Sequence, residues 1–174
     1  MISRPRFISD KSLSKGRREQ MMDARFLRNE MLWGKEGQAR LARAHVILFG
    51  LGGVGSYVAE CLARSGIGEL TLVDGDTVAL SNLNRQLEAL SSTIGLPKAE
   101  AVARRIAEIN PEAVLHPMQA LYNADNRPLF FPEGCHYDYI VDAIDLVSCK
   151  LDLAETARRL HIPLIMALGT GNKL

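Results

Sequence analysis

Apolar and polar residues follow one another in blocks along this chain, and the blocks have the lengths of strands and helices. The clearest stretch runs from His45 to Asp76: an apolar run enters a glycine-rich turn, a helical segment follows, and a second apolar run ends at Asp74. Short apolar runs bounded by turn residues are typical of buried strands. The stretch therefore predicts a strand, a tight turn, a helix and a second strand that an acidic residue closes.

The alternation continues on both sides of this stretch. Apolar residues at steps of three and four after Pro97 give one apolar face, which predicts a helix that Asn110 and Pro111 end. Helices are also predicted at 23–33, 37–44 and 148–160, the first two separated by Gly34, and strands at 113–120, 139–144 and 162–168. Strands that alternate with helices and are apolar on both faces indicate an α/β fold, a doubly wound, mainly parallel sheet with helices on both faces.

In such sheets the ligand lies across the carboxyl ends of the strands. Gly50, Asp74 and Asp145 each directly follow a predicted strand, so we expect all three at one crevice. The chain stops shortly after the last predicted strand, at Leu174. A complete domain seldom ends there without a capping element, and we therefore expect that a C-terminal part is missing.

Composition and charge divide the chain into two parts. Its 174 residues, 47% apolar and 24% charged, provide for one globular domain with a sizeable core. Residues 1–28 carry eight basic and three acidic side chains, whereas the remainder balances to −4 within a net charge of +1. We interpret residues 1–22 as a flexible basic arm and residues 23–174 as the domain. A basic arm suggests an anionic partner, although many such arms are only solvated tails.

The cysteines and histidines indicate neither a disulfide framework nor a metal site. Cys61, Cys135 and Cys149 are odd in number and show no CxxC spacing, which favours a reducing compartment. Because the chain also lacks a secretory signal and an apolar run long enough for a membrane span, we expect a cytoplasmic protein. Cys61 is predicted to be buried on the apolar side of its helix. The four histidines show no metal-ligand spacing and are not expected to be ligands.

The glycine-rich turn predicts a nucleotide site. Gly50 permits a tight turn, Gly52 lets backbone N–H groups approach a phosphate, and Gly55 lets the helix pack close to the strand. The helix N-terminus offers unpaired donors to an anion, and Asp74 would accept hydrogen bonds from ribose hydroxyls. A strand-to-helix turn without a ligand is the alternative. Taken alone, the turn and Asp74 are most common in NAD enzymes.

A second group of polar residues favours adenylation over hydride transfer. Adenylation of a carboxylate needs cationic or amide groups around a triphosphate and a carboxylate that holds a metal ion. Asn82, Arg85, Lys98 and Asp145 form such a set and are expected at the same crevice. The structural alternatives are that Arg85 and Lys98 are surface charges, and that Asp74 and Asp145 cap the turns that follow them.

Four motifs in this order resemble the family of ThiF, MoeB and the ubiquitin-activating enzymes: GxGGxG, LVDGDTVALSNLNRQ, GLPKAEAVARRIAEINP and VDAID. The resemblance covers about residues 25–174 and implies an adenylating enzyme that uses ATP and Mg²⁺. The implied ATP-binding residues are Gly50, Gly52, Gly53, Gly55, Asp74, Asp76, Ser81, Asn82, Arg85 and Lys98. The resemblance implies catalytic roles for Arg28, Asn82, Arg85, Lys98 and Asp145, with Asp145 as the metal ligand. Arg28 matches an arginine that reaches the partner subunit's ATP in family members, which implies a homodimer.

The segments RFLRNEMLWGKEG and GTGNKL are most similar to family members that act on tRNA. The implied reaction is the ATP-dependent cyclisation of threonylcarbamoyladenosine next to the anticodon, through adenylation of its threonyl carboxylate. The alternative within the family is adenylation of the C-terminal glycine of a ubiquitin-like sulfur carrier. A sulfur-relay protein is a further possible partner, and no DNA partner is expected. An NAD-dependent oxidoreductase and a module that only binds a nucleotide are the alternatives outside this reaction class.

Overall fold

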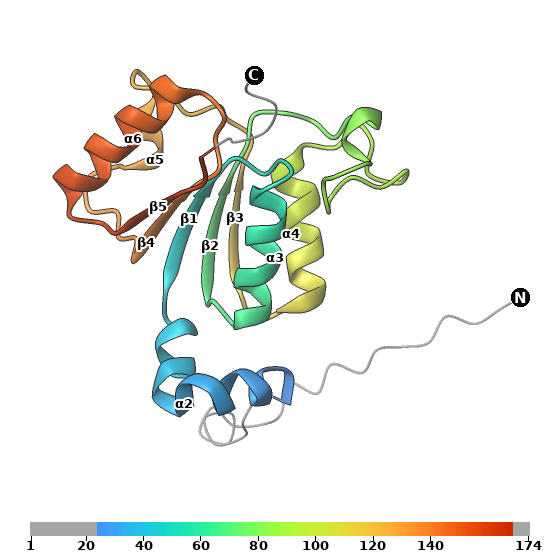
Figure 1. Cartoon of the computed structure of the whole chain (residues 1–174), viewed down its shortest axis with the longest axis vertical. Helices are drawn as coiled ribbons and strands as arrows, with labels where there is room; N and C mark the ends of the chain where they lie inside the picture. The colour runs from blue at the N-terminus through green and yellow to red at the C-terminus, as the bar shows by residue number, and fades with distance from the viewer. Residues whose placement is uncertain (1–23, 169–174) are drawn as a thin grey trace, which may run out of the picture.

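A computed structural model describes residues 24–168 of the chain, so the predicted basic arm 1–22 and the GTGNKL segment lie outside the described residues. Figure 1 shows one sheet with helices on both of its faces. The elements in chain order are η1 (Ala24–Phe26), α2 (Leu27–Leu41), β1 (His45–Phe49), α3 (Gly55–Ser65), β2 (Glu69–Val73), η2 (Leu80–Asn82), α4 (Lys98–Ile109), β3 (Val114–Met118), α5 (Arg127–Phe130), β4 (Tyr139–Asp142), α6 (Val147–Leu160) and β5 (Leu164–Met166).

The sheet is parallel throughout and has the strand order β3-β2-β1-β4-β5. The chain builds outward from β1 through β2 to β3 and then returns to the other side of β1 for β4 and β5. The direction of winding therefore reverses between β1 and β4. The structure confirms the predicted doubly wound fold, and the reversal is the point at which such sheets bind ligands.

Each face of the sheet has its own apolar core. Helices α3 and α4 cover one face, and α6 with the segment around α5 covers the other (Figure 1). The first core includes Val46, Leu48, Leu51, Leu70, Leu72, Val102 and Ile106, and the second includes Ile47, Phe49, Val73, Phe130, Ile140 and Leu153. Alternate residues of β1 serve opposite cores, because successive side chains of a strand point to opposite faces.

Several predicted details were wrong. The last strand is shorter than predicted, and Ile165 is 56% exposed because β5 lies at an edge of the sheet. Strand β4 ends at Asp142, so Asp145 follows it in a loop. Cys61 is exposed, because it lies on the side of α3 away from Ala59 and Ala63, which pack into the core.

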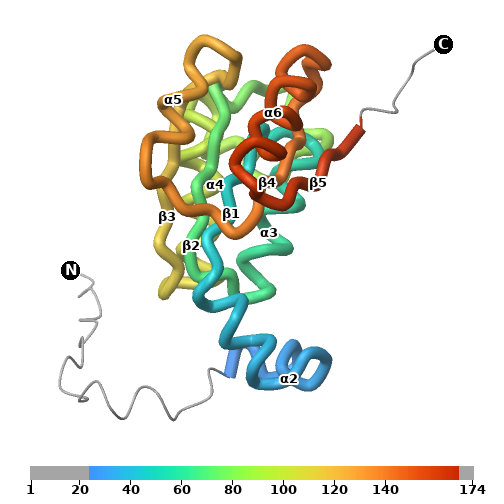
Figure 2. Tube along the Cα trace, turned by 90° about the vertical axis from the view of Figure 1, so that its left-hand side faces the viewer, coloured from blue at the N-terminus to red at the C-terminus, as the bar shows by residue number. Residues whose placement is uncertain are grey.

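Helix α2 lies apart from the helices that cover the sheet. It is bent at Gly34, whose φ of 73° and ψ of 171° are not helical, so the predicted interruption is confirmed. Figure 2 shows α2 beyond the amino ends of the strands, at the end of the sheet opposite the loops that follow β1 and β4. Among the described helices, none is both long and apolar enough to cross a membrane.

Candidate nucleotide-binding site

A hollow of about 490 Å³ lies at the carboxyl ends of β1, β2 and β4, at the reversal of the sheet. Most of the residues predicted for the nucleotide site line it: Gly50, Gly52, Gly53, Asp74, Asp76, Asn82, Arg85, Lys98 and Asp145. Gly55 and Ser81 are not among the lining residues: Gly55 begins α3, and the backbone carbonyl of Ser81 accepts a hydrogen bond from Arg85. A larger hollow of about 790 Å³ beside α2 contains none of the predicted residues. The predicted crevice therefore exists, with Gly55 and Ser81 outside it.

The glycine turn joins β1 to α3 in a shape that side chains would obstruct. Gly50 has a φ of 84°, and a Cβ there would lie 2.7 Å from the carbonyl oxygen of Ala143. A Cβ on Gly55 would lie 1.8 Å from the carbonyl oxygen of Gly50. Both predicted roles, the tight turn and the close approach of the helix, are confirmed. A Cβ on Gly52 would meet nothing closer than 3.5 Å, so the protein's own packing does not require glycine there.

Asp74 fastens the glycine turn to the end of β2. One carboxylate oxygen accepts a hydrogen bond from the backbone N–H of Leu51 at 2.7 Å, and the other accepts one from the backbone N–H of Asp76 at 2.8 Å. The residue is 9% exposed. Hydrogen bonds to charged groups are among the stronger ones in proteins, so this carboxylate fixes the turn before any ligand binds. Its predicted contact with ribose would use the remaining lone pairs and stays a prediction.

Lys98 is a buried cation at the N-terminus of α4. It is 6% exposed, and its ammonium group lies 3.0 Å from a carboxylate oxygen of Asp76. The backbone N–H of Lys98 also donates to the carbonyl oxygen of Asp76. The alternative of an ordinary surface charge is thereby excluded for Lys98. Asp76, which has a side-chain exposure of 64%, holds this ammonium at the wall of the hollow.

Asn82 and Arg85 belong to one short loop but differ in exposure. Asn82 is 8% exposed, and its side-chain oxygen accepts a hydrogen bond from the backbone N–H of Ala79 at 2.9 Å. Arg85 is exposed and donates to the carbonyl oxygen of Ser81 and to the side chain of Asn84. Asn82 therefore shapes the loop, whereas the guanidinium of Arg85 lines the hollow with surface available to a ligand.

The VDAID motif contains two aspartates in different environments. Asp145 is exposed at the hollow and makes no hydrogen bond or ion pair with another described residue. Asp142 is fully buried, accepts from the backbone N–H of Ile144 at 2.9 Å, and lies 3.0 Å from the ammonium of Lys150. Lys150 also donates to the carbonyl oxygen of Ala167. The ion pair between Asp142 and Lys150 was not predicted from the sequence, although two aspartates within four positions of each other at the end of a buried strand were a usable signal.

A second hydrogen-bond network that was not predicted from the sequence supports the part of the hollow that Tyr122 lines. Tyr122 lines the hollow, and its hydroxyl donates to Asp152 at 2.6 Å. Arg127 donates to both oxygens of the same carboxylate. Burial raises the pKa of Tyr122 to about 12, so its hydroxyl stays protonated. Cys149, whose role the sequence left open, is buried with its thiol 3.0 Å from the carbonyl oxygen of Tyr122.

Glu88 is a buried acid beside this site. It is 2% exposed, and neither of its carboxylate oxygens has a hydrogen-bond partner among the described residues. Burial raises the pKa of Glu88, and the nearby positive charge of Lys98 acts in the opposite direction. A carboxyl group in such surroundings favours its neutral form. No pattern in the sequence singled out this residue.

Arg28 is the one predicted catalytic residue that the fold separates from the others. It is exposed on α2, beyond the amino ends of the strands, whereas the hollow lies at their carboxyl ends (Figure 1). Arg28 therefore does not contribute to the hollow of its own chain. Its expected contact with a partner subunit's ATP stays a prediction.

Comparison with known proteins identifies the family. A family model described as the ThiF family matches residues 26–173. This chain belongs to the ThiF family. The resemblance that the four motifs carry is thus confirmed.

Three relatives bear on the function of the ThiF-family chain. It is 45% identical over 148 residues to the tRNA threonylcarbamoyladenosine dehydratase of Bacillus subtilis, covering 85% of this chain and 58% of that protein. The crystal structure of the Escherichia coli tRNA N6-threonylcarbamoyladenosine dehydratase in complex with ATP superposes with a TM-score of 0.81 at 40% identity, covering 92% of this chain and 63% of that chain. The molybdopterin-synthase adenylyltransferase of E. coli is 35% identical over 130 residues, covering 75% of this chain and 51% of that protein. The chain thus spans little more than half the length of these relatives.

Proposed function

We propose that this chain is the ATP-using part of a tRNA threonylcarbamoyladenosine dehydratase, a ligase-type enzyme that cyclises the modified nucleoside next to the anticodon. The observation that carries the proposal is the single hollow that Gly52, Arg85, Lys98 and Asp145 line together at the reversal of the sheet. The names of the more similar relatives in B. subtilis and E. coli supply the substrate. A hydride-transferring enzyme would have no use for these cations and this acid around one phosphate site.

The residues of the hollow match the parts of a triphosphate. The glycine turn and the N-terminus of α3 present backbone N–H groups to an anion, and the cations of Arg85 and Lys98 line the same hollow. Oxygen ligands are the ones that Mg²⁺ prefers, and the carboxylate of Asp145 is exposed at the hollow without a partner among residues 24–168. Asp145 is therefore the residue that would hold Mg²⁺, which neutralises phosphate charge when bound.

The chemistry consists of two substitutions. An oxygen of the threonyl carboxylate attacks the α-phosphorus of ATP, the bond to the bridging oxygen breaks, and pyrophosphate leaves. A nucleophilic atom of the carbamoyl group then attacks the activated carbonyl carbon, the ring closes, and AMP leaves. Arg85 and Lys98 stabilise the negative charge that develops at the phosphates. Asp74 holds the glycine turn that positions the phosphates. No nucleophilic side chain is required.

The second candidate is adenylation of the C-terminal glycine of a carrier protein. The 35% identity to a molybdopterin-synthase adenylyltransferase favours it, because the phosphate chemistry is shared and only the carboxylate donor differs. The higher identity to the dehydratases over a longer stretch favours the tRNA substrate.

The proposed assembly is a homodimer in which Arg28 of one subunit approaches the ATP of the other. Its support is that Arg28 is exposed at the end of the sheet away from its own hollow, so a contact with ATP would have to be with ATP bound to a second chain. A sulfur-relay protein and a cytoplasmic location remain expectations from the sequence.

The test measures ATP–pyrophosphate exchange and nucleoside composition. The chain is incubated with ATP, Mg²⁺ and tRNA that carries threonylcarbamoyladenosine, and the digested tRNA is analysed by mass spectrometry. We expect exchange that depends on the modified tRNA, release of AMP and the cyclic nucleoside. If a ubiquitin-like carrier stimulates ATP–pyrophosphate exchange and the modified tRNA does not, the second candidate is established instead. Nicotinamide cofactor binding without ATP binding would contradict both.

A further inference from the structure

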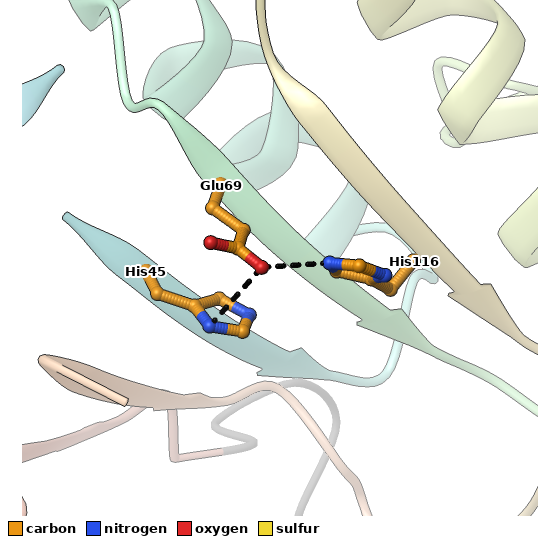
Figure 3. A group of neighbouring side chains, drawn as sticks. All are labelled: His45, Glu69 and His116. Carbon is orange, nitrogen blue, oxygen red and sulfur yellow. Dashed lines mark hydrogen bonds and ion pairs between the residues drawn. The ribbon is translucent and has the colours of Figure 1, made fainter. Parts of the chain in front are cut away.

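Three side chains converge at the opposite end of the sheet from the nucleotide hollow. His45, Glu69 and His116 come from the neighbouring strands β1, β2 and β3, and Figure 3 shows both imidazole rings directed at the carboxylate between them. His45 Nδ1 lies 3.5 Å from Glu69 Oε1, and His116 Nε2 lies 2.7 Å from the same oxygen. All three potential ligand atoms lie within 4.8 Å of one another.

The strand register explains why residues so far apart in the sequence meet. His45 pairs with Glu69 across β1 and β2, and Thr71 pairs with His116 across β2 and β3. Paired residues of adjacent parallel strands point to the same face, as do alternate residues of one strand. All of these side chains therefore lie on the face that α6 covers near the carboxyl ends. The separations in sequence hide the cluster, which is why spacing alone excluded these histidines as ligands.

Small shifts would bring the three ligand atoms, which lie within 4.8 Å of one another, to the separations of a tetrahedral metal site. Zinc bonds to histidine nitrogen and carboxylate oxygen place neighbouring ligand atoms roughly 3.3–3.6 Å apart. The 3.5 Å contact of His45 already has this length, and the 2.7 Å contact of His116 has to open slightly. The side chain of His116 is 47% exposed on the edge strand β3, so it is free to make this adjustment.

The hydroxyl group of Thr71 supports the orientation of the imidazole ring that His45 needs in order to bind a metal ion. Metal coordination through Nδ1 places the ring proton on Nε2, and Thr71 Oγ1 lies 2.9 Å from that nitrogen, where it accepts the proton's hydrogen bond. Metal-binding histidines usually have such a partner for their second nitrogen.

We propose that His45, Glu69 and His116 form a binding site for a divalent first-row transition ion, with zinc as the reference ion. Two imidazoles and one carboxylate leave the fourth position open to water. Imidazole ligands favour zinc, copper or nickel over magnesium and calcium. The site joins the amino ends of β1, β2 and the edge strand β3. His45 begins β1 and Phe49 ends it, beside the nucleotide hollow, so four steps of ~3.3 Å separate the two ends by about 13 Å. The site is therefore distinct from the proposed magnesium position.

The test is zinc titration of the chelator-stripped 174-residue chain against a chromogenic competitor, followed by cobalt absorption spectroscopy. We expect one equivalent of zinc per chain. The variants His116→Ala and Glu69→Gln should each weaken binding about tenfold or more, because each loses one ligand. The matched control is His161→Asn, which removes an exposed histidine from outside the cluster and retains a residue that tolerates its φ of 55°.

Three outcomes would overturn the proposal. The first is zinc affinity in both ligand variants equal to that of the parent chain. The second is a cobalt spectrum with thiolate charge-transfer absorption that disappears in Cys61→Ser, since the exposed Cys61 would then be the ligand. Circular dichroism of each variant checks that it is folded. Excess magnesium should leave the zinc titration unchanged, and displacement of zinc by magnesium would also contradict a site with two imidazole ligands.

Discussion

The two ends of this sheet collect different kinds of side chain. At the carboxyl ends, helices α3 and α4 begin, at Gly55 and Lys98, and the hollow contains cations and backbone N–H donors. At the amino ends the same helices terminate, at Ser65 and Ile109, and the sheet presents two imidazoles and a carboxylate. Helix N-termini favour anions and C-termini favour cations. The beginnings of α3 and α4 therefore favour a phosphate ligand at the carboxyl ends. The proposed metal site lies on the opposite face of the sheet, which α6 covers, and depends on its own side chains.

At the carboxyl ends of the strands, some polar side chains stabilise the fold and others remain available to contact a ligand. Asp74, Asn82 and Asp142 already use their side-chain oxygens in hydrogen bonds to backbone N–H groups. Asp145 makes no such contact within residues 24–168, and Arg85 is exposed. This contrast separates the residues that build the hollow from those that would act on a ligand. The variants below test that separation, from the largest expected effect to the smallest.

The largest effect is expected from Asp142→Ala, because it leaves the buried ammonium of Lys150 without its carboxylate partner. Removal of one partner from a buried ion pair typically lowers the free energy of unfolding by about 3–5 kcal/mol. Denaturant unfolding followed by circular dichroism measures the change. Asp145→Ala is the matched control from the same motif and should alter stability by less than ~0.5 kcal/mol. Equal losses of unfolding free energy in the two variants would contradict the distinction between residues that build the hollow and residues that would act on a ligand.

Asp145→Ala and Arg85→Ala should each lower the adenylation rate while the fold survives. Loss of one group that stabilises developing charge costs about 3 kcal/mol, roughly a hundredfold in rate. ATP–pyrophosphate exchange measures the effect. The control is Arg158→Ala, which removes an exposed arginine on α6 that pairs only with Glu155 among the described residues. Near-parental rates in both variants would remove Asp145 and Arg85 from the active site.

Two glycines of the same turn should respond differently to alanine. Gly55→Ala forces a Cβ to within 1.8 Å of the Gly50 carbonyl oxygen and should lower the free energy of unfolding by about 1–3 kcal/mol or more. Gly52→Ala meets no protein atom closer than 3.5 Å and should leave stability nearly unchanged while weakening ATP binding. Thermal unfolding and ATP titration measure the two effects. Undiminished ATP affinity in Gly52→Ala would show that the phosphates do not approach that backbone.

The smallest effect concerns pH at the amino end. Because burial lowers the pKa of His45 below its ordinary value, the folded chain binds the His45 proton less readily than the unfolded chain. His45 therefore contributes stability that is fully present above about pH 6.5 and decreases as the pH falls below it. With a chelator present, unfolding between pH 5 and 7 should depend more strongly on pH in the parent chain than in His45→Gln. The neighbouring Glu69, His116 and Asp138 are retained in both, so an identical dependence would contradict the prediction.

The local sequence was sufficient wherever one segment makes the feature. The tight turn at Gly50, the close approach at Gly55, the interruption at Gly34 and the helix after Pro97 were all predicted correctly, because each depends on neighbours within a few residues. The contact of Gly50 with the distant Ala143 was not predicted. The prediction for Cys61 was wrong, because the burial of a helical side chain depends on which face meets the sheet. The shortened β5 has a similar cause, since only the finished sheet determines which strand lies at an edge.

The pattern of apolar blocks and the glycine turn determined the fold class and the end of the sheet at which the hollow lies. These are repeated local signals, and parallel winding leaves few ways to arrange them. Only the tertiary structure decided which charged side chains form ion pairs: Lys98 with Asp76, and Asp142 with Lys150. It alone brought His45, Glu69 and His116 together. Register between strands sets such contacts, and register depends on the packing of the whole sheet, which no single stretch of sequence contains.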